Sequence, residues 1–305
     1  FRIAMQQLGG KCVYSSEFDA NAQKTYFTNF GELPFGDITQ ELIKKFIPDN
    51  FDILCGGFPC QPFSIAGYRK GFEDTRGTLF FDVADIIQRK HPKAIFLENV
   101  KNLKTHDNGN TFRVIRETLE ELGYAVYDKV MSPDIYANIP QNRERIFIVA
   151  FSKSLTPNYR DFHFPNKVRL THTIHDCIDE TVSDSRYFYT ERMGHYNELV
   201  NTIKSKNSVY QWRRIYVREN KSGVCPTLTA NMGTGGHNVP LILTDNGIRK
   251  LTPKECLNFQ GFPSDYVFPS DISNSACYKQ TGNSVAVPLI KKVCHQIWLI
   301  LSQNL

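Results

Sequence analysis

The sequence predicts an α/β fold, in which a mostly parallel sheet carries helices on both faces and a smaller, irregular domain is attached. Up to about residue 150, short apolar runs alternate with longer segments of helical periodicity, which is the pattern of βαβ units. From about residue 165 to 250 the chain is richer in His, Asn, Thr and Gly and loses clear periodicity. With 305 residues the chain is long enough for a large domain with a smaller one attached.

Apolar runs and three- or four-residue periodicity locate the individual elements. We predict strands at Cys12–Ser15, Ile53–Cys55, Ala94–Leu97, Ala125–Lys129 and Ile146–Phe151. We predict helices at Thr78–Arg89, at Thr111–Leu122 and, packed back on the sheet, at Ser284–Leu301. Leu8-Gly9-Gly10 is typical of a helix C-cap, and Gln280–Val285 is typical of a tight polar turn before the last helix.

The composition is that of a globular protein, with 41% hydrophobic and 22% charged residues. No apolar stretch reaches the roughly 18 residues of a membrane span and no signal-peptide pattern is visible, so we expect no membrane contact. The eight cysteines are scattered, without a C-x-x-C pair or a histidine cluster. This spacing argues against a metal site and against a secreted disulfide framework, and it favours the cytoplasm.

Positive charge is concentrated in one part of the chain. The formal net charge is +5, and residues 201–250 contain eight basic residues against two acidic ones. Tyr210, Trp212 and Tyr216 alternate with the basic residues. Such a patch suits a polyanion such as nucleic acid, although a solvated surface is the commoner meaning of positive charge.

Cys60 is the candidate nucleophile. It follows the predicted strand Ile53–Cys55 after a Gly-Gly break, and Pro59 and Pro62 stiffen the turn around it. The thiol is thereby presented at the carboxyl end of a strand, where open α/β sheets place their chemistry. Filling a core gap is the usual role of an isolated cysteine and suits Cys55, inside the apolar run. Cys60 lies among prolines and polar residues, which favours a nucleophile.

A carboxylate and two arginines accompany this thiol. Glu98 directly follows the predicted strand Ala94–Leu97, so we expect it at the same sheet edge as Cys60, as a proton-handling partner. It could instead support a helix N-terminus or form a surface ion pair. Arg143 and Arg145, two residues apart before a strand, point to one face. They could be surface charge, or they could clamp an oxygen-rich substrate and lower the pKa of the thiol.

Glu17 ends the strand that is predicted around Cys12–Ser15, and Phe18 follows it. In dinucleotide-type folds an acid in this place receives the ribose hydroxyls, and an adjacent aromatic ring can stack on adenine. The glycine loop that should precede the acid is absent from the sequence. The glycine-punctuated, charged segment Gly67–Gly77 follows Cys60 and is interpreted as a lid or a linker.

Five sequence blocks appear in a characteristic order: Gly57-Phe-Pro-Cys-Gln-Pro-Phe-Ser64, Glu98-Asn-Val100, Gln141-Asn-Arg-Glu-Arg145, Leu251–Cys256 with Gln260–Pro263, and Gly282-Asn-Ser-Val285. With these blocks, essentially the whole chain resembles the bacterial DNA (cytosine-5)-methyltransferases of the HhaI type. The resemblance implies an S-adenosylmethionine-dependent methyltransferase (Rossmann-like) fold. It also implies a catalytic domain of residues 1–168 and 281–305, and a target-recognition domain with a hinge at residues 169–280.

The resemblance further implies a reaction. Cys60 would attack C6 of a cytosine that has left the duplex, because neither C5 nor C6 can be reached while the base is stacked. Glu98 would hydrogen-bond N3 and the exocyclic amine, Arg145 would contact the O2 side, and Arg143 would support the pocket. C5 would then take the methyl group of S-adenosylmethionine, and loss of the C5 proton would expel Cys60.

The same resemblance assigns binding positions. Those for the cofactor are Glu17, Phe18, Asp37, Ile38, Leu79 and Asn283. Among those for DNA, Gln211 would fill the gap left by the flipped base, Arg214 is a candidate guanine reader, and Thr227 would contact the DNA backbone. The implied partners are double-stranded DNA and, functionally, a restriction endonuclease. We expect a monomer without a metal ion.

The sequence departs from the family at its start. Family members begin with a strand and a Phe-x-Gly-x-Gly-Gly turn that holds the methionine part of the cofactor, whereas this sequence begins at Phe1, just after that turn. We therefore expect these 305 residues alone to bind S-adenosylmethionine weakly. An alternative function is a DNA-binding module without turnover. A cysteine hydrolase or redox enzyme ranks last, because no paired histidine or resolving cysteine accompanies Cys60.

Overall fold

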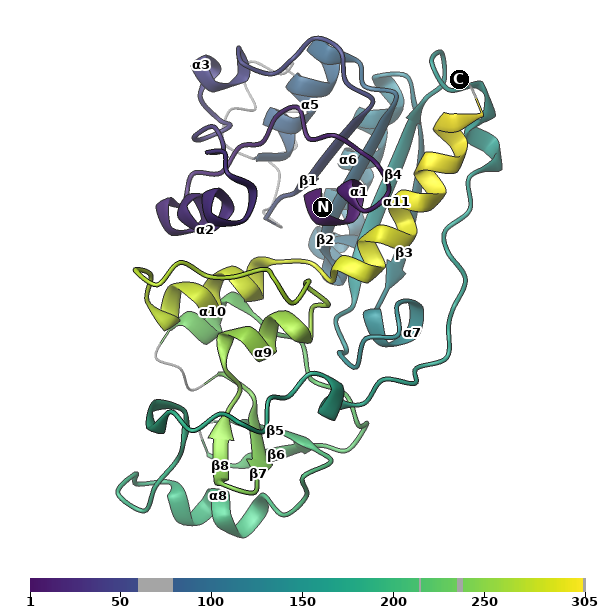
Figure 1. Ribbon diagram of the computed structural model, residues 1–305. Coiled ribbons are helices and arrows are strands. Elements are labelled where there is room, and N and C mark those ends of the chain that lie inside the picture. The colour runs from purple at the N-terminus through teal and green to yellow at the C-terminus, as the bar shows by residue number, and fades with distance from the viewer. Residues whose placement is uncertain (60–78, 214, 235–237, 304–305) are drawn as a thin grey trace.

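The computed structural model describes residues 1–59, 79–213, 215–234 and 238–303. The chain forms two lobes, which we call the large and the small lobe (Figure 1). The large lobe contains a four-stranded sheet in the order β1-β2-β4-β3. The small lobe contains a four-stranded sheet in the order β6 (Val217–Asn220), β5 (Val209–Trp212), β7 (Leu241–Thr244) and β8 (Gly247–Lys250). The strands of the large lobe are β1 (Ile53–Gly57), β2 (Ala94–Val100), β3 (Tyr124–Met131) and β4 (Arg145–Ser152).

The predicted α/β class is confirmed, and these four strands contain four of the five predicted ones. The sheet is nevertheless mixed and not mostly parallel in the described part of the chain. β1 and β2 are parallel, whereas β4 runs antiparallel to both of its neighbours, β2 and β3. The reason is the connection after β3: the chain turns back through a short helix, with no crossover, and inserts β4 between β2 and β3.

The predicted strand Cys12–Ser15 does not form. Around it the structure has only an isolated parallel bridge between Ser16 and Phe35, in which Glu17 N donates to Phe35 O at 2.8 Å. Val13 is about half exposed, at 51%, so the run lacks the buried face that would fix a strand in a sheet. The bridge still brings the Ser16–Glu17 and Phe35–Asp37 segments side by side.

Helices cover both faces of the large sheet (Figure 1). The helix predicted at Thr111–Leu122 is confirmed, and so is the described part of the one predicted at Thr78–Arg89. The glycine turn after the first helix is also confirmed, because Gly9 has a φ of +86° and Gly10 N donates to Met5 O at 2.9 Å. The helices of this lobe are α1 (Arg2–Gln6), α2 (Ala20–Phe30), α3 (Glu41–Lys44), α5 (Leu79–Lys90), η2 (Lys101–Lys104), η3 (His106–Gly109), α6 (Asn110–Glu121), α7 (Pro133–Tyr136), η4 (Pro157–Asp161) and α11 (Val287–Ser302).

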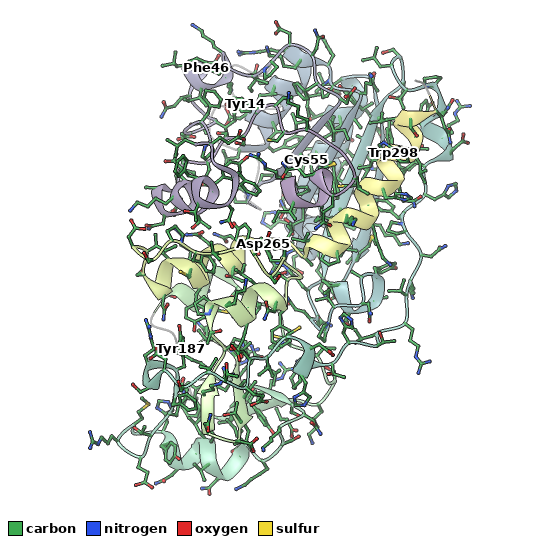
Figure 2. All side chains as sticks on the ribbon, viewed as in Figure 1. Tyr14, Phe46, Cys55, Tyr187, Asp265 and Trp298 are labelled. Carbon is green, nitrogen blue, oxygen red and sulfur yellow. The ribbon has the colours of Figure 1, made fainter. Side chains whose placement is uncertain are left out.

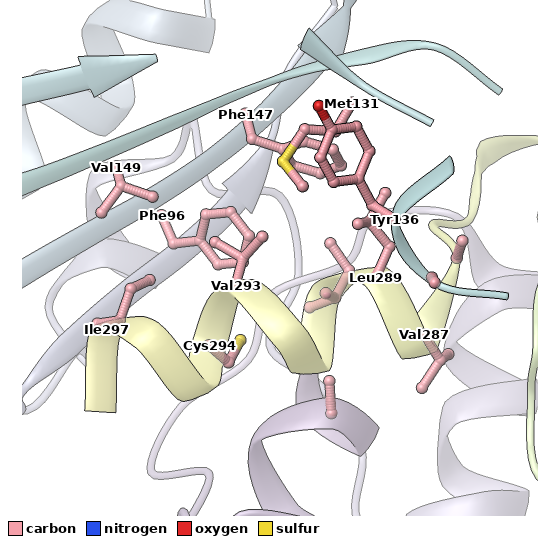
Figure 3. Packing of buried hydrophobic residues seen from close by; sticks show 14 of the residues in the cluster. Phe96, Met131, Tyr136, Phe147, Val149, Val287, Leu289, Val293, Cys294 and Ile297 are labelled. Atoms are coloured by element: carbon pink, nitrogen blue, oxygen red, sulfur yellow. The ribbon is translucent and has the colours of Figure 1, made fainter. Parts of the chain in front are cut away.

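Alternating side chains of β2 and β4 enter two separate cores. Phe96 and Val149 belong to the cluster that α1 and α11 cover, as Figure 3 shows for α11. Ile95, Leu97 and Ile148 belong to the cluster on the other face, together with side chains of α5 and α6. This period of two is what a strand buried on both faces requires. The central strands are therefore held rigidly from both sides.

Among the described residues, one segment has the length and apolar composition of a membrane span, and it contains the last helix, α11. That segment is Asn274–Ser302, with a mean hydropathy of 1.3 over its best window. Its apolar side chains, such as Val293 and Ile297, are buried against the sheet (Figure 3). The hydropathy of α11 is therefore that of a core helix, with Trp298 about half exposed at 48% (Figure 2).

The small lobe is built from short elements, as the weak periodicity predicts. They are η5 (Ile174–Asp176), η6 (Ser185–Tyr187), α8 (Tyr196–Thr202), β5 (Val209–Trp212), β6 (Val217–Asn220), η7 (Ala230–Gly233), β7 (Leu241–Thr244), β8 (Gly247–Lys250), α9 (Pro253–Asn258) and α10 (Asn274–Asn283). The prediction of a turn at Gln280–Val285 is wrong for its first four residues, which complete α10. Ser273 caps this helix by accepting a hydrogen bond from Ala276 N, and Ser284 ends it.

Candidate active site

Glu98 and Arg145 meet at the end of two neighbouring strands. Glu98 lies in β2 opposite Phe147 of β4, and Arg145 is the first residue of β4. Arg145 Nε lies 3.0 Å from Glu98 Oε1, and the two side chains are only 15% and 12% exposed. Glu98 and Arg145, two of the candidate site residues, are thus adjacent in a place largely shielded from water.

The chain that leads to Cys60 passes directly beside this pair. Asn99 Nδ2 donates to Phe58 O at 2.8 Å, which ties the end of β1 to β2. A Cβ atom on Gly57 would lie 3.4 Å from Glu98 Oε2, so the end of β1 lies next to this carboxyl group. Cys60 itself lies outside the described residues, as does the proposed lid Gly67–Gly77.

Cys55 lies inside β1 and is partly buried. Cys55 packs against the cluster formed by α1 and α11 (Figure 2). Burial raises the pKa of its thiol to about 12, so the thiolate that a nucleophile needs is scarce at neutral pH. The sequence-based interpretation of Cys55 as a small hydrophobe agrees with this position.

Burial also sets the charge state of the pair. It raises the pKa of Glu98, against the opposing effect of Arg145 and Arg143, and it lowers the pKa of Arg145. The pKa of Arg143 falls to about 9 because of burial and the nearby Arg145. Burial therefore favours the protonated form of Glu98 more than water would, whereas the two arginines favour its charged form.

A buried polar atom without a partner lies next to this ion pair. Arg143 Nε has no hydrogen-bond partner among the described residues, whereas Glu98 Oε1 faces Arg145 Nε at 3.0 Å. Buried polar groups are normally paired, so Arg143 Nε is available to bind a further polar group. Glu98 and Arg143 line a small cavity whose other walls are mostly apolar: Pro133, Phe147, Val285, Ala286 and Leu289, with Arg145 beside them. The cavity combines apolar walls with three polar side chains.

Arg143 is buried, at 3% exposure, and does not itself contact Arg145 or Glu98 by a hydrogen bond. Its Nη1 donates to Leu228 O at 2.6 Å, and its Nη2 donates to Gly282 O at 3.0 Å and Ser284 O at 2.6 Å. No sequence pattern indicates these contacts, since the partners lie 85 to 141 positions away.

The positions assigned to the cofactor lie around the bridge of Ser16 and Phe35 and at the end of α10. Phe18 is 75% exposed, an unusual state for a large aromatic side chain. Glu17 accepts a hydrogen bond from Asp19 N at 2.8 Å, and Asp19 pairs with Lys279 of α10 at 2.8 Å. An exposed ring beside a carboxylate is suited to stack on adenine and bind ribose hydroxyls, so these residues fit the expected cofactor.

The remaining cofactor positions are spread over three elements. Asp37 follows Phe35 of the bridge, and its Oδ1 accepts hydrogen bonds from Thr39 N and Oγ1 at 3.0 and 2.9 Å. Ile38 is partly buried. Leu79 is the first described residue of α5 and packs against the second core, and Asn283 ends α10 with an exposed side chain.

Two of the three expected DNA-binding residues are described. Gln211 lies in β5, and its Oε1 accepts a hydrogen bond from Arg213 Nη2 at 3.0 Å. Thr227 turns back to the large lobe, where its Oγ1 donates to Asn142 O at 2.8 Å. Arg214 lies outside the described residues.

The basic patch predicted within residues 201–250 needs one correction. Arg249 is 1% exposed and forms a bidentate ion pair with Glu255, at 2.8 and 2.7 Å. Glu255 also completes a capping box with Thr252 at the start of α9. Arg249 therefore stabilises the inside of the small lobe and adds no charge to its surface.

Comparisons with known proteins agree with this geometry. A family model described as "C-5 cytosine-specific DNA methylase" matches residues 1–298. The type II methyltransferase M.Bsp6I of Bacillus sp. (strain RFL6) is 52% identical, over 94% of this chain and 90% of the relative. M.HpaII of Haemophilus parainfluenzae is 47% identical, over 95% and 84%, and M.HhaI of Haemophilus parahaemolyticus is 42% identical, over 97% and 90%.

Solved structures share the fold at much lower identity. A Spodoptera frugiperda DNMT2 mutant aligns with a TM-score of 0.72 at 21% identity, covering 97% of this chain and 96% of the other. S. pombe Dnmt2 aligns with a TM-score of 0.71 at 17% identity, covering 99% and 94%. The chain belongs to the C-5 cytosine-specific DNA methylase family and is a DNA (cytosine-5)-methyltransferase.

Proposed function

We propose that this enzyme transfers a methyl group from S-adenosylmethionine to C5 of a flipped-out cytosine in a specific short site of double-stranded DNA. We also propose that it is the modification part of a type II restriction-modification system, working beside a cognate endonuclease in the bacterial cytoplasm as a monomer. The observation that carries the proposal is the buried pair of Glu98 and Arg145 beside the strand that leads to Cys60.

The chemistry of cytosine matches this pair. N3 accepts a hydrogen bond and the exocyclic amine donates one, which is the pattern that a protonated carboxyl group complements with its O–H and C=O. Burial raises the pKa of Glu98 and so favours that protonated form. Arg145, next to it at the start of β4, is proposed to donate to O2 of the base.

Cys60 is proposed to supply the nucleophile. Its thiolate forms a bond to C6 while Glu98 gives its proton to N3, so that the ring electrons gather at C5. Bound S-adenosylmethionine supplies an electrophilic methyl group to C5. Loss of the C5 proton to a base then breaks the bond between sulfur and C6 and releases the thiolate. N3 returns its proton to Glu98, which restores the neutral aromatic base.

The cofactor is proposed to bind where the bridge of Ser16 and Phe35 approaches the end of α10. Phe18 would stack on the adenine, Glu17 would receive the ribose hydroxyls, and Asp37 with Ile38 would hold the base edge. Leu79 and Asn283 would complete the site from α5 and α10. The exposed face of Phe18 is the observation that supports this assignment.

The small lobe is proposed to read the DNA. Gln211 would occupy the space left by the flipped cytosine, Arg214 would donate to a guanine, and Thr227 would bind the DNA backbone. The type II methyltransferases M.Bsp6I and M.HpaII are similar over nearly the whole chain, which supports a short specific site as the target.

Transfer of a tritiated methyl group to unmethylated genomic DNA, followed by bisulfite sequencing, tests the proposal. We expect label in DNA and protected cytosines at one recurring short sequence. Cys60→Ser should give neither. Label in DNA with no protected cytosine, or undiminished transfer by Cys60→Ser, would contradict the proposal.

A further inference from the structure

Arg143 joins three parts of the chain that the proposed function uses. Its guanidinium binds Leu228 O, next to the expected DNA contact Thr227, and it binds Gly282 O and Ser284 O on both sides of Asn283. Its own backbone lies two residues before Arg145, and its N–H donates to Ser132 Oγ at 3.0 Å. One side chain therefore connects residues 225–230, which we call the recognition segment, with the end of α10 and with the cavity at Glu98, which we call the base pocket.

The recognition segment is held on two sides near Arg143. Cys225 N donates to Pro140 O at 2.7 Å, and Asn142 N donates to Cys225 O at 2.9 Å. On the other side, a Cβ atom on Gly282 would lie 2.1 Å from Thr229 C and 2.2 Å from Ala230 N. Residues 225–230 are thus held against residues 140–143 and against α10 at the same time.

The fork of Arg143 sets the spacing of these parts. A guanidinium is planar and holds its donors in fixed directions, so three carbonyl oxygens bound to it keep fixed relative positions. Arg143 also lines the cavity with Glu98, where its Nε has no partner among the described residues. A displacement of Leu228 or Ser284 would therefore move the wall of the cavity as well.

We infer that Arg143 is a positioning residue that couples the seating of the recognition segment on DNA to the completion of the base pocket at Glu98. This inference rests on the proposed function. In this inference Arg143 does not contact the reacting atoms. It sets the relative positions of the Thr227–Leu228 segment, the Gly282–Ser284 turn and Glu98. Reactions of oriented groups are sensitive to such distances, and a displacement of about 1 Å costs roughly 100-fold in rate.

Arg143→Lys tests the coupling, because lysine keeps the charge but not the planar fork. Hydrogen exchange of the variant, without DNA or cofactor, should be faster in peptides that contain Leu228–Ala230 and Gly282–Ala286, and unchanged in the hairpin of β7 and β8. No change in either peptide, or an equal rise throughout the small lobe, would overturn the inference. This readout does not depend on activity, so it separates failure of the coupling from failure of the proposed function.

Kinetics with DNA give the second test. For Arg143→Lys we expect a roughly 100-fold lower single-turnover methylation rate, with dissociation constants for DNA and cofactor within about threefold of the wild type. Gly282→Ala disturbs the recognition segment from the other side and should give the same pattern. Arg113→Lys, an exposed i,i+4 partner of Glu117, is the control and should leave the rate unchanged. A normal rate in both Arg143→Lys and Gly282→Ala, or a loss of affinity equal to the loss of rate, would overturn the coupling.

Discussion

Replacing Glu98 by Gln tests the proposed role of the buried carboxyl group. Gln has nearly the same shape and can still hydrogen-bond a base, but it cannot give a proton to N3. Glu98 faces Arg145 at 3.0 Å and is 12% exposed, so solvent water is poorly placed to replace the missing proton. Loss of a positioned acid costs roughly 10²–10⁴-fold in rate, and we expect the variant to lose at least about 100-fold.

The assay is single-turnover transfer of a tritiated methyl group to unmethylated DNA, with DNA affinity measured in parallel. Glu144→Gln is the matched control, because Glu144 precedes Arg145 directly but is partly exposed and paired with Lys101. The control should stay within about twofold of the wild type, because surface ion pairs contribute little. A Glu98→Gln enzyme within tenfold of the wild type would refute the assignment of Glu98 as the proton donor.

Three further outcomes follow from burial and exposure. Burial raises the folded-state pKa of Glu98 above its ordinary value of 4.5, so the stability of the wild type relative to Glu98→Gln should be highest below pH 4.5. This difference in stability should fall by up to about 1.4 kcal/mol per pH unit as the pH rises through the folded-state pKa. Urea unfolding across pH measures the difference, and a pH-independent value would contradict the prediction. Glu255→Gln leaves Arg249 buried without its carboxylate and should lower the free energy of unfolding by about 3 kcal/mol, whereas a change under 1 kcal/mol would contradict the buried pair. Phe18→Ala should raise the calorimetric dissociation constant of S-adenosylmethionine roughly two- to tenfold without lowering the melting temperature, since the ring is exposed. Phe27→Ala, at a half-exposed position on α2, is the control, and a Phe18→Ala affinity equal to that of the wild type would refute the stacking.

Short-range patterns in the sequence predicted the core of the large lobe. The apolar runs that became β1 to β4 and the helical period of α6 are local signals, and burial on both faces made them strong. The strand at Cys12–Ser15 fails because its run is short and has no partner strand among the described residues that would cover Val13. The antiparallel insertion of β4 depends on how the chain returns after β3, which no local pattern encodes.

The site was predictable to the extent that its residues lie near strand ends. The sequence places Glu98 just after one strand and Arg145 just before another, whereas the structure extends β2 to Val100 and begins β4 at Arg145. The two residues meet because β2 and β4 are neighbours. The three carbonyl partners of Arg143 were not predictable, since main-chain oxygens leave no trace in residue types. The burial of Arg249 had one overlooked signal: the Thr-x-x-Glu pattern of a capping box places Glu255 at the start of α9.

The most direct test of the account is covalent trapping by DNA that carries 5-fluorocytosine at the methylated position. Fluorine at C5 cannot leave as the proton does, so the bond from Cys60 to C6 should persist once the methyl group has been transferred. We predict a protein–DNA complex that survives denaturing electrophoresis, requires S-adenosylmethionine and is absent with Cys60→Ser. Efficient methylation of ordinary DNA without any trapped complex, or a complex that persists in Cys60→Ser, would contradict the covalent mechanism.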